Sequence, residues 1–209
     1  MKRNTIILGA LLSAAAATAA PEYVNIATPN TSLILMTDSA AAPALLYYGP
    51  AVADPVQAAL AAPENRRTDA YPVFGNYPEG ESALSLTMPD GNMTLVLEQK
   101  GTPRVTSEAG GTTVTSIPLA DRHYPVEVTL NYRTYPGEDV IETWADITNR
   151  GKKPLTLTRF DSAALPFASA DAWLTSLYGS WANEARVNTE RITPGMKVIQ
   201  NKDGARNSH

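Results

Sequence analysis

The sequence has 209 residues and no cysteine, which excludes a disulfide framework, thiolate catalysis and a cysteine-ligated metal site. It carries 17 basic and 21 acidic side chains, for a formal net charge of −4. A mildly acidic chain without a cluster of lysine and arginine argues against nucleic acid or an anionic membrane as its partner.

The first residues have the three parts of an export signal. A Lys-Arg pair follows the initial Met, residues 6–17 form a short apolar stretch, and residues 17–19 are small, as at a cleavage site. The apolar stretch is shorter than the roughly 20 residues that a helix needs to cross a bilayer, and no later segment is apolar and long enough to do so. We therefore expect a signal peptide over residues 1–19, a mature domain over residues 20–209, and a periplasmic or extracellular protein without a membrane span.

Residues 49–70 are rich in alanine, proline and charge. We expect a long surface loop there, with one short helix within residues 52–62, bounded by Pro55 and Pro63. Long loops in compact domains are usually functional or disordered.

Most of the remaining sequence predicts short antiparallel strands. Apolar and polar residues alternate with period two over residues 126–133, and a second strand-like segment, residues 140–147, follows the turn-rich residues 136–139. These two segments should form a hairpin. We expect residues 155–160 to continue the meander.

Turn signals divide the other strands. Asp90-Gly91 favours a turn with positive φ, which predicts a hairpin between residues 83–88 and 93–99, and Gly110-Gly111 marks another reversal. Strands at this regular spacing, without an internal repeat or a linker, predict an all-β fold, a large antiparallel β-sandwich in one domain.

Residues 172–184 combine aromatic side chains with a carboxylate, namely Trp173, Tyr178, Trp181 and Glu184. Aromatic faces beside a carboxylate suit sugar rings, whose C–H groups are apolar and whose hydroxyls need strong acceptors. The alternative is structural, with Trp173 and Leu177 in the core and Trp181 at its rim.

Other signals of catalysis are few. The two histidines, His123 and His209, lie 86 residues apart, and we expect His123 to be a hydrogen-bonding residue at a strand end. The sequence has no nucleophile elbow, no metalloprotease motif and no phosphate-binding glycine loop, so we expect no metal site and no cofactor. Carboxylates such as Asp139, Glu142 and Glu184 are scattered, and their spacing singles out no acid–base pair.

Six motifs follow one another in order over residues 24–209. They are Arg66–Gly75, Tyr124-Pro125 with a strand ending in Tyr132, Glu138–Trp144 with Asn149, Asp161–Ala163, Trp173-Leu174 with Gly179–Glu184, and Gly204–His209. In this order they resemble the N-terminal domain of the α-galactosidases of glycoside hydrolase family 36.

The resemblance implies a β-supersandwich that precedes a (β/α)8 barrel. In that family the barrel supplies both catalytic aspartates of a retaining mechanism, which needs two carboxyls roughly 5–5.5 Å apart. The resemblance therefore implies that this sequence contains no catalytic residue. It also implies that the chain is an N-terminal portion of an exported enzyme and that its sandwich lacks the last strands. The implied partners are the enzyme's own barrel, a galactose-containing oligosaccharide and, since the family can build its pocket across a subunit boundary, a homo-oligomer.

The same resemblance indicates residues at the substrate rim. In the loop after Tyr71-Pro72, Asn76 and Tyr77 stand where the family often has Asp and an aromatic residue after Gly75. Glu79 or Glu81 occupies the neighbourhood where an Arg often follows, and a carboxylate only accepts hydrogen bonds, whereas Arg donates them.

A second rim candidate comes from Trp181 and Glu184. They match the family's Gly-x-Trp-x-x-Glu pattern, which is either a contact between sandwich and barrel or a contact with ligand. The rim candidates are thus Asn76, Tyr77, Trp181 and Glu184.

Two other interpretations remain open at this point. The chain is a stand-alone carbohydrate-binding module with Trp181, Tyr178 and Tyr77 as its platform, or it is an inactive truncated product whose unpaired sheet edge favours aggregation.

Overall fold

A computed structural model of the protein describes residues 22–39, 41–61, 68–75, 81–166, 171–180 and 183–200. The chain divides into two compact units, residues 1–166 and residues 167–209. Among the described residues, no helix is long and apolar enough to cross a membrane. The predicted signal peptide over residues 1–19 lies outside the described residues.

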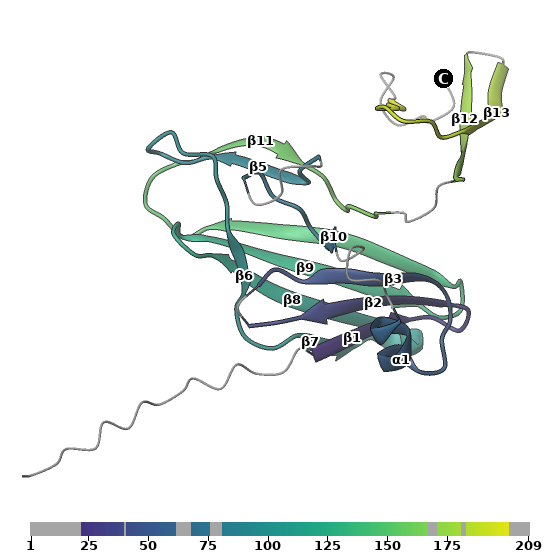
Figure 1. Cartoon of the computed structure of the whole chain (residues 1–209), viewed down its shortest axis with the longest axis horizontal. Helices are drawn as coiled ribbons and strands as arrows, with labels where there is room; N and C mark the ends of the chain where they lie inside the picture. Colours follow the sequence, from purple (N-terminus) through teal and green to yellow (C-terminus); the bar gives the residue numbers. More distant parts are fainter. Residues whose placement is uncertain are drawn as a thin grey trace, which may run out of the picture. The chain divides into compact units, whose positions relative to one another are not determined.

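The first sheet of the first unit is antiparallel, in the order β1-β2-β3-β4. Figure 1 shows β1, β2 and β3 as neighbouring strands. The predicted short helix, α1, forms between β3 and β4, and the Asp54 side chain caps it by accepting from the backbone N–H groups of Val56 and Gln57, both at 3.0 Å. The short helix expected within residues 52–62 is therefore present, while the two ends of the segment expected as a loop belong to β3 and β4. The elements are β1 (Glu22–Ala27), β2 (Thr31–Thr37), β3 (Ala44–Pro50), α1 (Pro55–Leu60) and β4 (Thr68–Asp69).

The second sheet has the order β10-β9-β8-β6, and β7 also pairs with β8. The predicted hairpin of residues 126–133 and 140–147 is confirmed as β9 and β10, with β9 two residues longer at the turn end and β10 two residues longer at the opposite end. The reversal predicted at Gly110-Gly111 joins β7 to β8. The strands are β6 (Leu97–Gln99), β7 (Arg104–Ser107), β8 (Thr113–Asp121), β9 (Val126–Tyr135) and β10 (Val140–Asn149).

Two predicted pairings are wrong. The Asp-Gly turn forms, with Gly91 at φ 87° and the Met88 N–H donating to the Asn92 carbonyl at 2.8 Å, but its flanking strands do not form a hairpin. Instead β5 (Leu84–Thr87) pairs with β11 (Thr156–Phe160), while β6 joins β8. Residues 155–160 therefore do not continue the meander beyond β10, because a turn sequence sets a local reversal while burial selects the partner strand.

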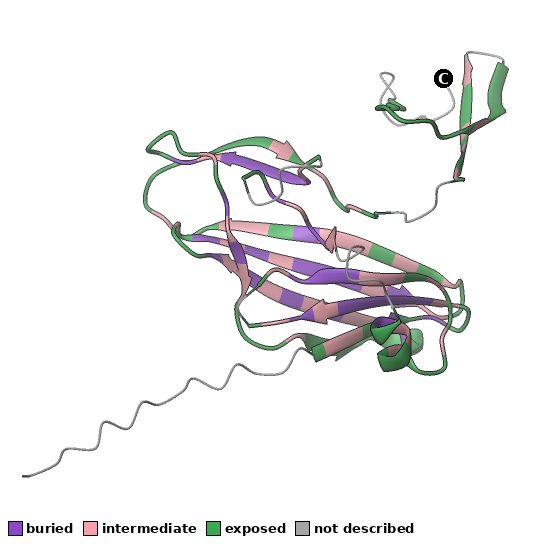
Figure 2. Cartoon of the chain, viewed as in Figure 1, coloured by how far each residue is buried: buried purple, intermediate pink, exposed green. Residues whose placement is uncertain are grey.

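A single apolar core joins the two larger sheets and β5. Along β8 and β9 every second residue is buried, as the period-two pattern requires, whereas β2 is buried at nearly every position (Figure 2). The largest fully buried side chains are Ile26, Leu33, Ile34, Leu35, Leu84, Leu86, Leu95, Leu97, Ile117, Leu119, Val126 and Val128. This shared core makes the first unit a β-sandwich.

The buried carboxylate of Asp121 joins three stretches of backbone at the end of β8. It accepts from the N–H groups of Val96 at 2.6 Å, His123 at 2.9 Å and Tyr124 at 2.7 Å. Because Asp121 is only 8% exposed, these bonds hold the turn before β9 against the segment that leads into β6.

A second carboxylate links the turns of the two sheets. Asp139, in the β9–β10 turn at φ 55°, accepts from the Thr28 hydroxyl and, at 3.3 Å, from the Asn30 N–H in the β1–β2 turn. These hydrogen bonds, that from Thr28 first, hold the pKa of Asp139 below its usual range.

The second unit contains an antiparallel hairpin of β12 (Trp173–Ser180) and β13 (Asn183–Arg191). Trp173 and Leu177, for which a core position was one of two alternatives, are 62% and 51% exposed. Trp173, Leu177 and the Val187 opposite Leu177 are all exposed, and a two-stranded ribbon has no interior of its own in which to bury them.

Replacing Asp139 by Asn should lower the free energy of unfolding at neutral pH and make that free energy less dependent on pH in the acidic range. A carboxyl group whose folded pKa is depressed stabilises the fold above its unfolded pKa, and this stabilisation is lost as the pH falls through the folded value, below about pH 4. Asn keeps the turn compatible with positive φ, so the variant isolates the charge. The measurement is the thermal unfolding midpoint of both proteins at about pH 7 and about pH 3. Equal losses on acidification would mean that this carboxylate does not carry the effect.

Candidate functional site

Backbone hydrogen bonds anchor the described residues on both sides of residues 76–80. The Ala83 N–H donates to the Pro72 carbonyl at 2.8 Å and the Phe74 N–H to the Leu84 carbonyl at 3.0 Å. The Phe74 carbonyl in turn accepts from the Leu95 N–H at 3.0 Å. Both flanks are therefore fixed to buried parts of the core.

Tyr71 fixes one flank from inside the core. Its ring is 4% exposed and its hydroxyl donates to the Asp161 carbonyl at 2.8 Å. Burial, and then the charge of Asp161, raises the pKa of Tyr71 to about 12. The phenol therefore stays neutral at physiological pH and serves as a structural donor.

Gly75 is the last described residue before residues 76–80. Its φ is 92°, and a Cβ placed on it would lie 2.9 Å from the Thr94 Cα. Both the backbone conformation and the close approach of the Thr94 backbone favour glycine at this position.

A groove of about 210 Å³ lies beside these flanks. Glu81 pairs with Arg159, which also pairs with Asp161 at 2.9 Å, so the Glu81 carboxylate is held by a cation within the same unit. The carboxylates of Glu81 and Asp69 can accept hydrogen bonds from hydroxyl groups of a ligand. The lining residues are Thr68, Asp69, Pro72, Glu81, Ala164, Leu165 and Pro166.

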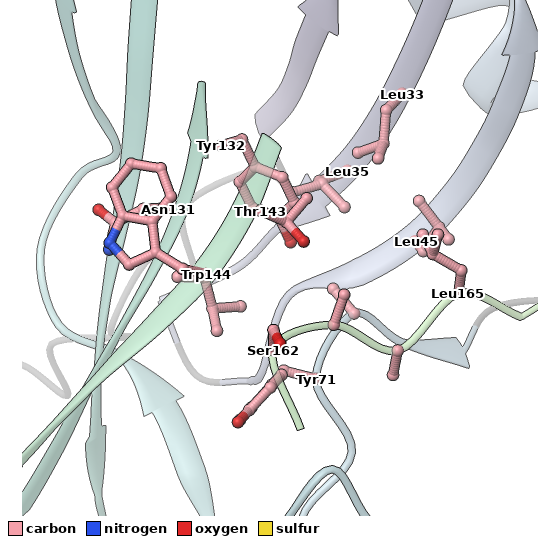
Figure 3. Close-up of a pocket in the computed structure, with 14 residues that line it drawn as sticks. Leu33, Leu35, Leu45, Tyr71, Asn131, Tyr132, Thr143, Trp144, Ser162 and Leu165 are labelled. Atoms are coloured by element: carbon pink, nitrogen blue, oxygen red, sulfur yellow. The ribbon is translucent and has the colours of Figure 1, made fainter. Parts of the chain in front are cut away.

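The cavity between the two sheets is too small for a sugar (Figure 3). Tyr132, Thr143 and Ser162 line it together with leucines from β2 and β3, and its volume of about 20 Å³ is near the minimum needed for one water molecule. Burial raises the pKa of Tyr132 well above its usual value, so this phenol is also neutral. The cavity is a packing feature.

The four predicted rim residues are not brought together within the described structure. Asn76, Tyr77 and Trp181 lie outside the described residues. Glu184 lies at the start of β13, exposed, in the second unit. Sequence reasoning did not indicate the groove, because Asp69 and Ala164 are far apart in the chain; Asp69 within the Arg-Arg-Thr-Asp motif was the available signal.

The other carboxylates considered for catalysis have structural partners. Asp139 binds the β1–β2 turn. Glu142 accepts from the Tyr135 hydroxyl at 2.8 Å and pairs with Arg133 at 3.0 Å, and these two contacts, Tyr135 first, lower its pKa. Within the described ranges, no three acidic, histidine or cysteine side chains gather as a metal site would need.

Comparison with known proteins gives a family match over residues 41–209, to the model described as the glycosyl hydrolase family 36 N-terminal domain. Alpha-galactosidase C of Emericella nidulans is 31% identical over 139 residues, which are 66% of this chain and 17% of that protein. Alpha-galactosidase AgaA of Geobacillus stearothermophilus is 28% identical over 149 residues, or 65% of this chain and 20% of AgaA. The chain thus spans about a fifth of these curated relatives.

Solved structures show the same fold. The α-galactosidase from Lactobacillus brevis superposes with a TM-score of 0.73 at 21% identity, over 84% of this chain and 28% of that one. A variant of AgaA from Geobacillus stearothermophilus in complex with stachyose gives 0.74 at 23% identity, over 83% of this chain and 28% of that chain. Another AgaA variant, in complex with raffinose, gives 0.72 at 23% identity over the same shares.

Gly75→Ala should destabilise the protein more than Gly91→Ala does. Both residues have positive φ, 92° and 87°, so each variant incurs a backbone cost of roughly 1–2 kcal/mol. Only the Cβ at position 75 meets another atom within 4 Å, and overpacking adds roughly 1–3 kcal/mol. Urea unfolding of the two variants measures the difference. Equal losses of unfolding free energy in the two variants would show that Thr94 moves away from the added Cβ at no cost.

Proposed function

Because the chain belongs to glycosyl hydrolase family 36, through the N-terminal domain of that family, we propose that it is the non-catalytic sandwich of an α-galactosidase. The enzyme would release terminal α-linked galactose from oligosaccharides. The family match over residues 41–209 is the observation that carries this proposal.

The proposed role of the sandwich is to support a catalytic (β/α)8 barrel and to present a loop to the substrate. The buried anchors on both sides of residues 76–80 support this role, because a loop fixed at its base can place a side chain reproducibly. Asn76 and Tyr77 would then contribute to the rim, and Trp181 with Glu184 would contact the barrel or the ligand.

The expected substrate is a galactose-containing oligosaccharide. AgaA of Geobacillus stearothermophilus, which this chain resembles, has been solved with raffinose and with stachyose. The groove beside the loop offers the carboxylates of Asp69 and Glu81, which suit sugar hydroxyls. Since Glu81 accepts hydrogen bonds and cannot donate them as Arg would, this groove would hold the sugar through acceptors.

The 209-residue chain by itself should not hydrolyse p-nitrophenyl α-galactoside. The complete open reading frame that contains it, expressed with any in-frame sequence after His209, should do so. AgaA of Geobacillus stearothermophilus serves as the positive control under the same conditions. Turnover by the purified 209-residue chain would mean that the catalytic residues lie inside the sandwich. Inactivity of the complete product would contradict the proposed enzymatic function.

We also propose that the protein is exported and cleaved after Ala19, because residues 1–19 have the composition of a signal peptide. Expression in a bacterium that has a Sec pathway should yield a periplasmic or secreted product that begins at residue 20. Intact-mass measurement of the fractionated protein tests this. A cytoplasmic product that retains residues 1–19 would contradict it, and replacing the Lys-Arg pair by Glu-Glu provides the export-deficient control.

A further inference from the structure

The first unit has a larger groove, of about 410 Å³, in a different place. Three segments that are far apart in the sequence form it, residues 88–90, 124–126 and 149–155. Its volume falls in the range of roughly 300–1,000 Å³ that small-molecule sites occupy. It shares no residue with the groove beside residues 76–80.

The floor of this groove is apolar. Met88 and Val126 are buried, and the half-buried Leu155 and Tyr124 pack against the core. Pro89 and Pro125 complete the apolar lining. A tyrosine ring beside two prolines offers the kind of surface on which the C–H face of a pyranose can stack.

Charged groups of both signs border that floor. The Asp90 carboxylate accepts from the Asn92 N–H at 3.0 Å and from the Tyr124 hydroxyl at 2.9 Å. These bonds, that from Asn92 first, lower the pKa of Asp90, so it is ionised at neutral pH and retains lone pairs for further donors. Lys152 and Lys153 also line the groove, and the charge of Lys153 contributes to the lowered pKa of Asp90.

Hydrogen bonds hold these segments in place without a ligand. The Arg150 N–H donates to the Pro125 carbonyl at 2.7 Å, and the Asn149 amide donates to the Lys153 carbonyl at 2.9 Å. The Asn92 amide donates to the Tyr124 hydroxyl at 3.0 Å. A ligand would therefore meet walls that are already formed, which reduces the ordering cost of binding.

We propose that this groove is a saccharide-binding site that takes a neutral hexopyranose unit, with its C–H face on the Tyr124 ring and its hydroxyls between Asp90 and Lys153. Hydroxyls both donate and accept, so they satisfy a carboxylate and an ammonium group in one ligand. A phosphate or an acidic peptide would meet the charge of Asp90, and a purely apolar partner would offer no hydrogen bonds to Asp90, Lys152 or Lys153. The proposal does not depend on the enzymatic function.

The test is an NMR titration of the 209-residue chain with raffinose, followed through its backbone amides. Binding with a Kd on the order of 1 mM should shift the amides of Asp90, Gly151 and Lys153. Tyr124→Ala should weaken binding at least about tenfold, and Lys153→Glu and Asp90→Asn several-fold. Tyr48→Ala is the matched control, because Tyr48 is 48% exposed on β3 and lines none of the grooves described.

Each outcome decides the assignment. If Tyr124→Ala fails to fold, the variants at the exposed Asp90 and Lys153 carry the test, since neither side chain belongs to the core. Absence of shifts up to tens of millimolar raffinose, or shifts confined to other residues, would overturn the site. Shifts of the same amides by a short oligoglutamate but not by raffinose would overturn the choice of ligand. Because the readout is binding by this chain, failure here is distinguishable from failure of the proposed hydrolysis.

Discussion

The carboxylate of Asp121 is the constraint on which much of the first unit depends. A buried carboxylate with three backbone N–H donors fixes the end of β8, the turn that carries Tyr124 and the approach to β6 in one step. Without these donors a charge at 8% exposure would be costly, and without the charge three N–H groups would lose their acceptor. The turn and the buried carboxylate therefore stabilise one another. Because the Tyr124 N–H is one of the three donors, this arrangement also positions Tyr124 in the larger groove.

The apolar core is a second source of stability. If the two sheets separated, the apolar face of each would be exposed to water. The core formed by side chains of β2, β5, β8 and β9 therefore joins them. Asp139 then connects the turns at one end through Thr28 and Asn30. The two sheets are thus joined both through the core and, at one end, through Asp139.

The polar groups in the two grooves differ in a way that bears on function. Beside residues 76–80, Asp69 and Glu81 provide acceptors, and Arg159 is engaged by two carboxylates. In the larger groove, acceptor and cationic groups border an apolar floor. Membership of glycosyl hydrolase family 36 accounts for the sandwich. The second groove follows from the contacts of this chain alone.

The sequence by itself determined the all-β class, the β9–β10 hairpin, the β7–β8 reversal and the family, because alternation, turn residues and motif order are local properties of a chain. Only the tertiary structure decided that β5 pairs with β11 and that Trp173 and Leu177 are exposed. It also decided that Tyr124 lies beside Asp90 and the Lys152-Lys153 pair. Of the predicted rim, only Glu184 lies within the described residues, and the structure adds that the residues on both sides of 76–80 are hydrogen-bonded to the core. The physical reason is that strand partners and groove walls are selected by burial between distant segments, which a local pattern does not encode.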